Sequence, residues 1–318
     1  MSAARQRRRA RERLAAARRA LILGIGGGGD VVGALAAAEA ARALGTDAVV
    51  GGITWERRPV DPIPGPRRLD EITGAERIHE VVALAGPDTR GPGGFAFCEA
   101  DMARFLGEPT VLVDPNAAVA TIAEGIDAAA ERLGCDLVGV LDVGGDVLAH
   151  GDEPGLASPL ADAVLLAAAS RTRTEAIGLL FGAGCDSELR PEEVAERLAE
   201  VAEAGGDLGE LELTPAALDR VEAALKMVTT EASAMAVRCA RGETGTATIR
   251  GGRRTVRLTP LGGKVVAFDC EAAIGSAARL ARAVRDAGSL DEANEILHGL
   301  GVRTELDLER DWAANRHL

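Results

Sequence analysis

The sequence predicts an α/β protein with a Rossmann-like, mostly parallel sheet and helices on both faces. Short apolar segments alternate with helical segments through the first two thirds of the chain. The apolar segments are continuously hydrophobic, as strands covered on both faces are, and lack the polar–apolar alternation of a half-exposed strand. The 318 residues, 47% of them hydrophobic, are enough for one large core.

The predicted elements follow one another in a regular order. Helices should end at glycines and begin at residues such as Ser158 and Thr214, each of which precedes a proline. The predicted strands cover residues 20–26, 47–55, 79–85, 109–115, 136–146 and 175–184. The predicted helices between them cover residues 30–45, 99–107, 117–134, 158–172 and 191–206.

We expect a basic extension over residues 1–19 and a single α/β domain over residues 20–318. Within that domain, residues 20–205 should form the sheet core, and residues 206–318 should add helices and a hairpin.

The added part should begin with one long helix over residues 214–242. A β-hairpin over residues 253–269 should follow, with Gly262 and Gly263 in its turn.

Charge and composition exclude several classes of protein. The net charge is −13, and the first 19 residues carry eight Arg and one Glu, so the body is strongly acidic and repels nucleic acid and anionic membranes. No apolar segment reaches the roughly 20 residues of a membrane span. The five cysteines form no C-x-x-C pair, which argues against a zinc knuckle and predicts free thiols in the cytoplasm.

The first glycine-rich loop, Gly26, Gly27, Gly28, Gly29 and then Asp30, follows a predicted strand and precedes a helix. Such a loop lets a ligand approach the backbone and offers helix N–H groups to an anion. An NAD site also needs an acid about 20 residues further on, but Glu56 lies 27 residues past Gly29. The Asp30 carboxylate would repel a pyrophosphate, so an ordinary NAD site is disfavoured.

A second loop, GVLDVGGDVLAHGDE, places further acids at another predicted strand end. One interpretation is a turn with solvated acids, and the other is a ligand site, because ligands bind beyond the carboxyl ends of parallel strands. In the second interpretation Asp142, Asp146 and His150 would be catalytic. Gly144, Gly145 and Asp152 would contact the ligand.

Two further residues follow predicted strands and are candidate ligand contacts. Trp55 precedes a proline-rich loop and would stack on a ligand, or else pack in the core. Asn116 would contact the ligand, or else cap a helix.

Converging carboxylates need a positive counterpart. We expect Mg²⁺ held by Asp30 and Asp146, with the backbone of residues 26–29 holding a phosphate. The leading hypothesis is an enzyme acting on a small polar metabolite, phosphorylated or nucleotide-like. The alternatives are a metal-free enzyme for a cationic amine or guanidinium substrate, and a non-catalytic ligand-binding or regulatory protein.

Four segments together resemble the prokaryotic family known as domain of unknown function 1152. They are ILGIGGGGDVVGAL, GGITWERRPVDPIPGPRRLDEI, VLVDPN and DVGGDVLAHGDEPGLASPLADA, and the resemblance extends from about Leu21 to Asp307. It implies one α/β unit and assigns no activity.

The helices over residues 158–170 and 222–237 carry apolar residues around much of their circumference. Such helices are either wholly interior or cover a subunit contact. We therefore expect a homo-oligomer, most simply a two-fold dimer, with the basic N-terminal helix lying on a neighbour's acidic surface.

Overall fold

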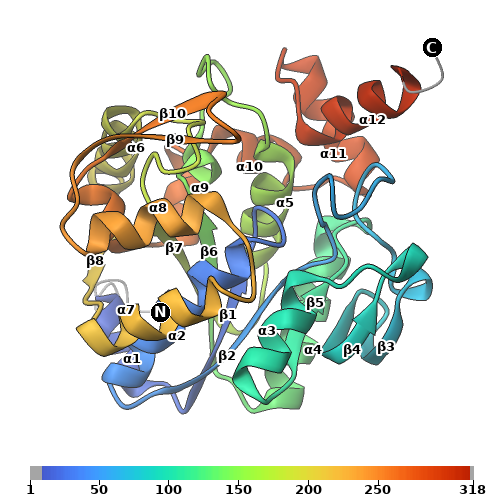
Figure 1. Ribbon diagram of the computed structural model, residues 1–318, viewed down its shortest axis with the longest axis horizontal. Helices are drawn as coiled ribbons and strands as arrows, with labels where there is room; N and C mark the ends of the chain where they lie inside the picture. The colour runs from blue at the N-terminus through green and yellow to red at the C-terminus, as the bar shows by residue number, and fades with distance from the viewer. Residues whose placement is uncertain (1–8, 316–318) are drawn as a thin grey trace.

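The structure is a computed structural model that describes residues 9–315, and it has the predicted α/β fold (Figure 1). In the described chain, nine strands form one mixed sheet. In spatial order they are β3 (Thr73–His79), β4 (Val82–Arg90), β5 (Thr110–Val113), β2 (Asp47–Ile53), β1 (Arg19–Gly24), β6 (Leu137–Val143), β7 (Glu175–Phe181), β11 (Val265–Phe268) and β8 (Asp207–Leu211).

The five central strands, from β5 to β7, are parallel. Strands β4 and β11 run antiparallel to their neighbours and extend the sheet at its two sides. The segment over residues 79–85, predicted as one strand, straddles a turn: His79 ends β3 and Val82 begins β4.

The direction of sheet growth reverses between β1 and β6. From β1 the chain proceeds to β2 and β5 on one side, whereas β6 is followed by β7 on the other side. The connections therefore diverge at the carboxyl ends of β1 and β6 and leave a crevice there, the place where open α/β sheets bind ligands.

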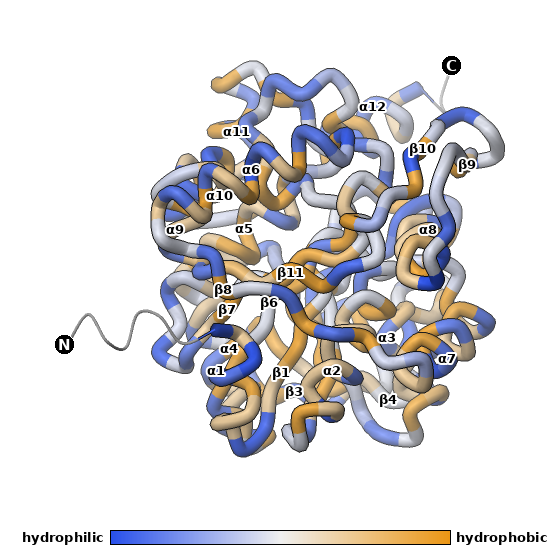
Figure 2. Tube along the Cα trace, turned by 90° about the vertical axis from the view of Figure 1, so that its left-hand side faces the viewer, coloured by the Kyte–Doolittle hydropathy of each residue, from blue (hydrophilic) through white to orange (hydrophobic). Residues whose placement is uncertain are grey.

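Helices cover both faces of the sheet, and the strands alternate between two cores. Leu21 and Leu23 of β1 pack into one core, and Ala20 and Ile22 pack into the other. The first core is covered by α4 (Val119–Leu133), α5 (Pro159–Ala169), α6 (Pro191–Glu203), α9 (Cys270–Gly275), α10 (Arg279–Val284) and α11 (Leu290–Gly299). The second is covered by α1 (Ala10–Ala16), α2 (Asp30–Ala43), α3 (Cys98–Leu106), α7 (Pro215–Ala224) and α8 (Glu231–Ala240). Apolar segments of the trace lie inside and polar segments at the outer turns (Figure 2).

The C-terminal third corrects two predictions. The long helix predicted over residues 214–242 is two helices, α7 and α8, separated by residues 225–230. The predicted hairpin pairs the wrong strands, because β10 (Arg254–Leu258) pairs with β9 (Gly245–Ile249).

Strand β11 belongs to the main sheet, between β7 and β8. All four of its residues are buried, as expected for a strand covered on both faces. The sheet therefore extends beyond the predicted 20–205 core.

The described part of the basic extension packs on its own chain. Ala10 and Leu14 of α1 are fully buried, and Arg13 lies 3.3 Å from Glu175. Residues 1–8 of the predicted extension lie outside the described residues.

Helix α5 is buried at every position by elements of the same chain. The apolar circumference of this helix is thus explained without a subunit contact. Among residues 9–315, none of the helices has both the length and the apolar character of a membrane span.

Candidate functional site

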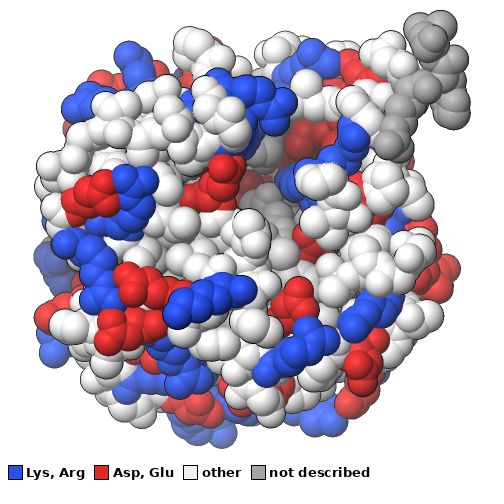
Figure 3. Space-filling model, in the orientation of Figure 1, with Lys and Arg blue, Asp and Glu red and all other residues white. Residues whose placement is uncertain are grey.

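A pocket of about 210 Å³ opens at the carboxyl ends of β1, β6 and β7, where the sheet reverses direction. Acidic and basic side chains surround the hollow on this face of the molecule (Figure 3). Two guanidinium groups, from Arg57 and Arg250, line the pocket. Six carboxyl groups crowd its interior: Asp30, Asp142, Asp146, Asp162, Asp186 and Glu188.

Three of these carboxyl groups form what we call the first carboxyl group set, Asp30, Asp142 and Asp162. One oxygen from each lies within 4.8 Å of the others. Asp142 lies near the end of β6 and Asp30 begins α2, so the strand ends bring them together, while Asp162 comes from the first turn of α5.

Backbone donors hold two members of the first set. The Gly26 and Val143 amides donate to Asp30 Oδ2 at 3.0 and 3.3 Å. The Gly145 amide donates to Asp142 Oδ2 at 2.8 Å. Asp162 differs: it is 1% exposed, and its Oδ1 has no hydrogen-bond partner in the described chain. Burial of a carboxyl oxygen without a hydrogen-bond partner is unfavourable.

The second carboxyl group set contains Asp146, Asp186 and Glu188, whose oxygens also lie within 4.8 Å of one another. Glu188 is the best satisfied of the three. Its Oε2 accepts the amides of Ala157 and Ser158 at 2.7 and 2.8 Å, and its Oε1 accepts the Ser158 hydroxyl.

Crowding and burial shift the acids toward their protonated forms. Burial raises the pKa of Asp142 to about 7. Burial, followed by the charge of Asp142, raises the pKa values of Asp30 and Asp162 well above the ordinary range. Burial, followed by the charge of Asp162, does the same for the pKa of Asp146. A positive charge bound in the pocket would therefore stabilise the ionised forms of these acids.

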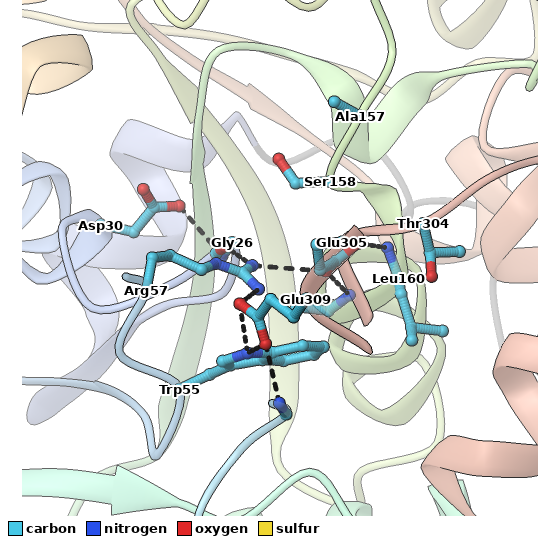
Figure 4. Close-up of polar contacts among 12 residues, drawn as sticks. Gly26, Asp30, Trp55, Arg57, Ala157, Ser158, Leu160, Thr304, Glu305 and Glu309 are labelled. Carbon is cyan, nitrogen blue, oxygen red and sulfur yellow. Dashed lines mark hydrogen bonds and ion pairs between the residues drawn. The ribbon is translucent and has the colours of Figure 1, made fainter. Parts of the chain in front are cut away.

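Arg57 is fixed by a network that reaches the C-terminal helix α12 (Glu305–Asn315) (Figure 4). Its Nη2 donates to the Gly26 carbonyl at 2.8 Å and to Glu305 Oε1 at 3.3 Å. Its Nη1 pairs with Glu309 at 3.6 Å, and its guanidinium lies 4.2 Å from the centre of the Trp55 ring. The Arg57 side chain thus links the glycine loop to α12.

Glu305 also holds the helix that carries Asp162. Its two carboxylate oxygens accept the Leu160 and Ala161 amides, both at 3.0 Å. These amides belong to the first turn of α5, whose N-cap residue Ser158 makes no side-chain cap. A residue from a distant helix therefore satisfies the donors of this buried helix start.

The glycine loop is packed closely around polar side chains. A Cβ atom on Gly26 would lie 2.8 Å from Asp30 Oδ2 and 3.0 Å from Asp162 Oδ2, so a side chain there would displace one of these carboxyl groups. The Gly26 amide donates to Asp30, and the Gly28 amide donates to the Trp55 carbonyl at 3.2 Å. Two of the four predicted phosphate-binding amides are thus committed within the protein.

The structure brings part of the predicted site together. Gly26, Gly27, Gly28, Gly29, Asp30, Asp142 and Asp146 line the pocket, although Asp30 and Asp146 fall into different carboxyl group sets. Gly144 and Gly145 lie beside it: the Gly145 amide binds Asp142, and Gly144 faces Asp186.

Besides Gly144 and Gly145, four further predicted residues do not line this pocket. His150 Nε2 contacts Glu200 at 3.0 Å, and Asp152 is exposed beside it. The Trp55 ring is fully buried against Arg57. Asn116 donates to Asp114 Oδ1 at 2.7 Å and to the Pro66 carbonyl, so it ties the proline-rich loop to the end of β5.

Sequence reasoning missed Asp162, Asp186, Glu188 and Arg250 as site residues. Asp186 and Glu188 follow β7, so the rule that placed Asp30 and Asp142 at strand ends extends to them. Asp162 looks like an ordinary acid at a helix start. Nothing local marks Arg250, which reaches the pocket from a hairpin.

Replacing Gly144 with alanine should distort the second carboxyl group set. Gly144 has φ +144°, and a Cβ atom there would lie 2.4 Å from Asp186 Cγ. We expect the free energy of unfolding to fall by about 2 kcal/mol or more, measured by urea denaturation. Gly299→Ala is the matched control, because a Cβ atom on Gly299 meets nothing within 4 Å. Equal stability of the two variants would contradict the packing described for Gly144.

The family of this chain follows from a comparison with protein-family models. The model described as "Protein of unknown function (DUF1152)" matches residues 21–313. The search of curated proteins and the search of solved structures each found no match. The family match spans almost the same residues as the resemblance noted in the sequence. The chain therefore belongs to the DUF1152 family.

Proposed function

We propose that this protein is a Mg²⁺-dependent enzyme that acts on a small phosphorylated metabolite. The observation that carries the proposal is Asp162 Oδ1, a buried carboxylate oxygen without a hydrogen-bond partner in the described chain. This carboxylate lines the pocket with Asp30 and Asp142. A divalent cation would supply the missing partner and offset the repulsion among the three acids.

The geometry of the first carboxyl group set suits such an ion. Mg²⁺ binds oxygen at about 2.1 Å in octahedral geometry, so its ligands lie at most about 4.2 Å apart. The three oxygens already lie within 4.8 Å of one another and need only a small contraction. Asp30, Asp142 and Asp162 would therefore hold the ion, in place of the predicted pair Asp30 and Asp146.

The second carboxyl group set supports the same chemistry. Asp146 contributes to it, and the charge of Asp162 acts on Asp146 across the pocket. This set would hold a second ion, or water bound to the first. Seven carboxyl groups line the pocket when the exposed Glu231 is included, against two guanidinium groups, so full ionisation would leave five negative charges uncompensated.

The coordination positions that the carboxylates would leave open on the ion favour a phosphorylated substrate. Mg²⁺ in enzymes commonly combines one or two carboxylates with waters and substrate phosphates. Arginine donors, which match phosphate oxygens, line the same pocket. The volume of about 210 Å³ is below the roughly 300–1,000 Å³ of sites for drug-sized ligands, so it favours a small metabolite over a whole nucleotide.

Calorimetry on protein stripped with a chelator tests this proposal. Mg²⁺ or Mn²⁺ should bind the wild-type protein and should fail to bind Asp162→Asn at the first set. The control is Asp88→Asn, which changes an exposed acid outside the pocket. Small phosphorylated sugars and acids, ATP, NAD and spermidine are then titrated with and without the metal. A phosphorylated compound should bind only in the presence of metal, and its turnover is followed by ³¹P NMR.

Other results would point to the other functions. Spermidine binding in chelator, with no metal binding, would replace the proposal with an enzyme for a cationic amine, since the pocket is rich in carboxylates. Metal-dependent binding of a phosphorylated compound without turnover would indicate a ligand-binding protein. Absence of metal binding to the wild-type protein would refute the Mg²⁺ site.

A further inference from the structure

The two arginines that line the pocket are held very differently. Arg57 contacts Gly26, Glu305, Glu309 and the Trp55 ring at once, and its side chain is 30% exposed. Its Nη2 is committed to Gly26 and Glu305, whereas its Nη1 has the 3.6 Å ion pair with Glu309 and no hydrogen bond among the described residues. Movement of the guanidinium toward a ligand would break the two Nη2 bonds. Arg57 is therefore a brace for the glycine loop.

The Arg250 guanidinium is held by much less. Among the described residues it makes one ion pair, with Glu188 Oε1 at 3.5 Å, and its side chain is 41% exposed. The pair joins a partly exposed guanidinium to a buried carboxylate, and its length lies at the limit of a hydrogen bond, so Arg250 is loosely held. The Arg250 guanidinium therefore has donors that can bind a ligand, and it lines the pocket.

Glu188 does not depend on Arg250. Its carboxylate already accepts the Ala157 amide, the Ser158 amide and the Ser158 hydroxyl. Loss of the 3.5 Å ion pair would leave this buried carboxylate with three donors. An exchange of Arg250 from Glu188 to another anion would therefore leave the Glu188 carboxylate hydrogen-bonded.

The hairpin fixes where Arg250 points. Strands β9 and β10 form a separate two-stranded sheet outside the main sheet, and Arg250 follows β9 directly at the turn. The Arg250 backbone has φ +54°, a left-handed conformation uncommon for a residue with a side chain. Its amide donates to Glu231 Oε2 at 2.7 Å, and the Arg254 guanidinium donates to the Gly155 carbonyl at 3.3 Å. The hairpin is thus anchored to Glu231, which lines the pocket, and to Gly155, and Arg250 lines the pocket together with the acids.

From these contacts we infer that Arg250 binds the phosphoryl group of the substrate, exchanging Glu188 for a phosphate oxygen when the substrate enters. This inference rests on the proposed function, because it takes the substrate to be a phosphate that sits beside a metal ion. Arg250 would then determine specificity for the anion, whereas Arg57 would determine the shape of the loop.

The test uses inorganic phosphate as the probe and the full chain loaded with Mn²⁺. Phosphate affinity is measured by calorimetry, and proximity of phosphate to the metal by paramagnetic broadening of its ³¹P signal. Arg250→Ala should weaken phosphate binding about 10- to 100-fold, as expected for loss of charge-assisted hydrogen bonds to an anion. Arg250→Lys should lose less, because it keeps the charge without the forked donors. Both variants should still bind Mn²⁺, because neither changes the proposed metal ligands Asp30, Asp142 and Asp162.

The control is Arg257→Ala on the same hairpin. Arg257 pairs with the exposed Glu192 at 2.6 Å and does not line the pocket, so phosphate affinity should equal that of the wild type. Phosphate affinity unchanged in Arg250→Ala, or lost together with Mn²⁺ binding, would overturn the role given to Arg250. A wild-type protein that binds Mn²⁺ but no phosphate would instead refute the proposed substrate class.

Discussion

Replacing Asp162 with asparagine is expected to stabilise the metal-free protein and to abolish its stabilisation by Mg²⁺. The Asp162 carboxylate is 1% exposed, and Asp142, Asp30 and Glu305 all raise its pKa in addition to the larger effect of burial. Removal of one acid from this cluster relieves both burial and repulsion. We expect a gain of about 1–3 kcal/mol in the free energy of unfolding at pH 8 in chelator.

The effect should reverse when metal is present. Mg²⁺ at about 1,000 times its dissociation constant stabilises a protein that binds it by about 4.1 kcal/mol, which exceeds the gain expected of the variant in chelator, and the variant lacks this stabilisation. Thermal unfolding in chelator and in Mg²⁺ should therefore rank wild type and variant in opposite orders. Asp88→Asn, on the surface, should change neither curve by more than about 0.5 kcal/mol. An Asp162→Asn variant that is less stable in chelator would show that the fold itself needs this carboxylate.

The stability of the metal-free protein should depend on pH because of the same buried carboxyl groups. The pKa of Asp142 is about 7 in the folded protein, whereas an unfolded Asp titrates near pH 4, roughly its ordinary value. The folded state therefore binds more protons between these values, and this contribution to stability is lost as the pH rises through about 7. Mg²⁺ binding requires ionised carboxylates, so stabilisation by metal should instead increase over the same range. Urea denaturation from pH 5 to 8, with and without Mg²⁺, measures both trends.

Replacing Glu305 with alanine is expected to cost about 3–5 kcal/mol, the largest loss expected of any variant considered. Glu305 is 4% exposed and accepts the Leu160 and Ala161 amides, and it also pairs with Arg57. The variant would leave two buried amides without acceptors and would remove one partner from a largely buried guanidinium. Glu305→Gln should lose less, because its amide oxygen still accepts one donor.

Urea denaturation measures the loss at Glu305, and hydrogen exchange at residues 160 and 161 locates it. The matched control is Arg310→Ala on the same helix, which removes an exposed pair with Asp291 and should change stability by about 0.5 kcal/mol or less. A loss below about 1 kcal/mol in Glu305→Ala would mean that α5 does not rely on this acceptor.

The sequence was sufficient to predict the parallel centre of the fold. Strands β1, β2, β5, β6 and β7 are continuous apolar segments between helices, a pattern typical of a parallel sheet with both faces covered. The outer strands were harder. The segment that forms β11 follows two glycines, which locally favours a hairpin, but burial of all four residues decides its place in the main sheet.

The site was predictable only where strands end. Asp30, Asp142 and Asp146 were identified because parallel strand ends share one edge of a sheet. Asp162 and Arg250 reach the pocket from a helix and a hairpin, and no local pattern records their long-range contacts. His150 and Asp152 are near Asp146 in sequence, which predicts that they join the site, but the chain turns away from the pocket before it reaches them.

The bond between Arg57 and Glu305 joins residues 248 positions apart, which has a consequence for how the chain folds during synthesis. A growing chain carries the glycine loop and most of the acids long before α12 leaves the ribosome. The brace between the glycine loop and α12 therefore forms only after nearly the whole chain has been made. Folding as a whole removes the pocket acids from water and raises their pKa values. In the absence of metal, folding at neutral pH therefore takes up protons from the solvent.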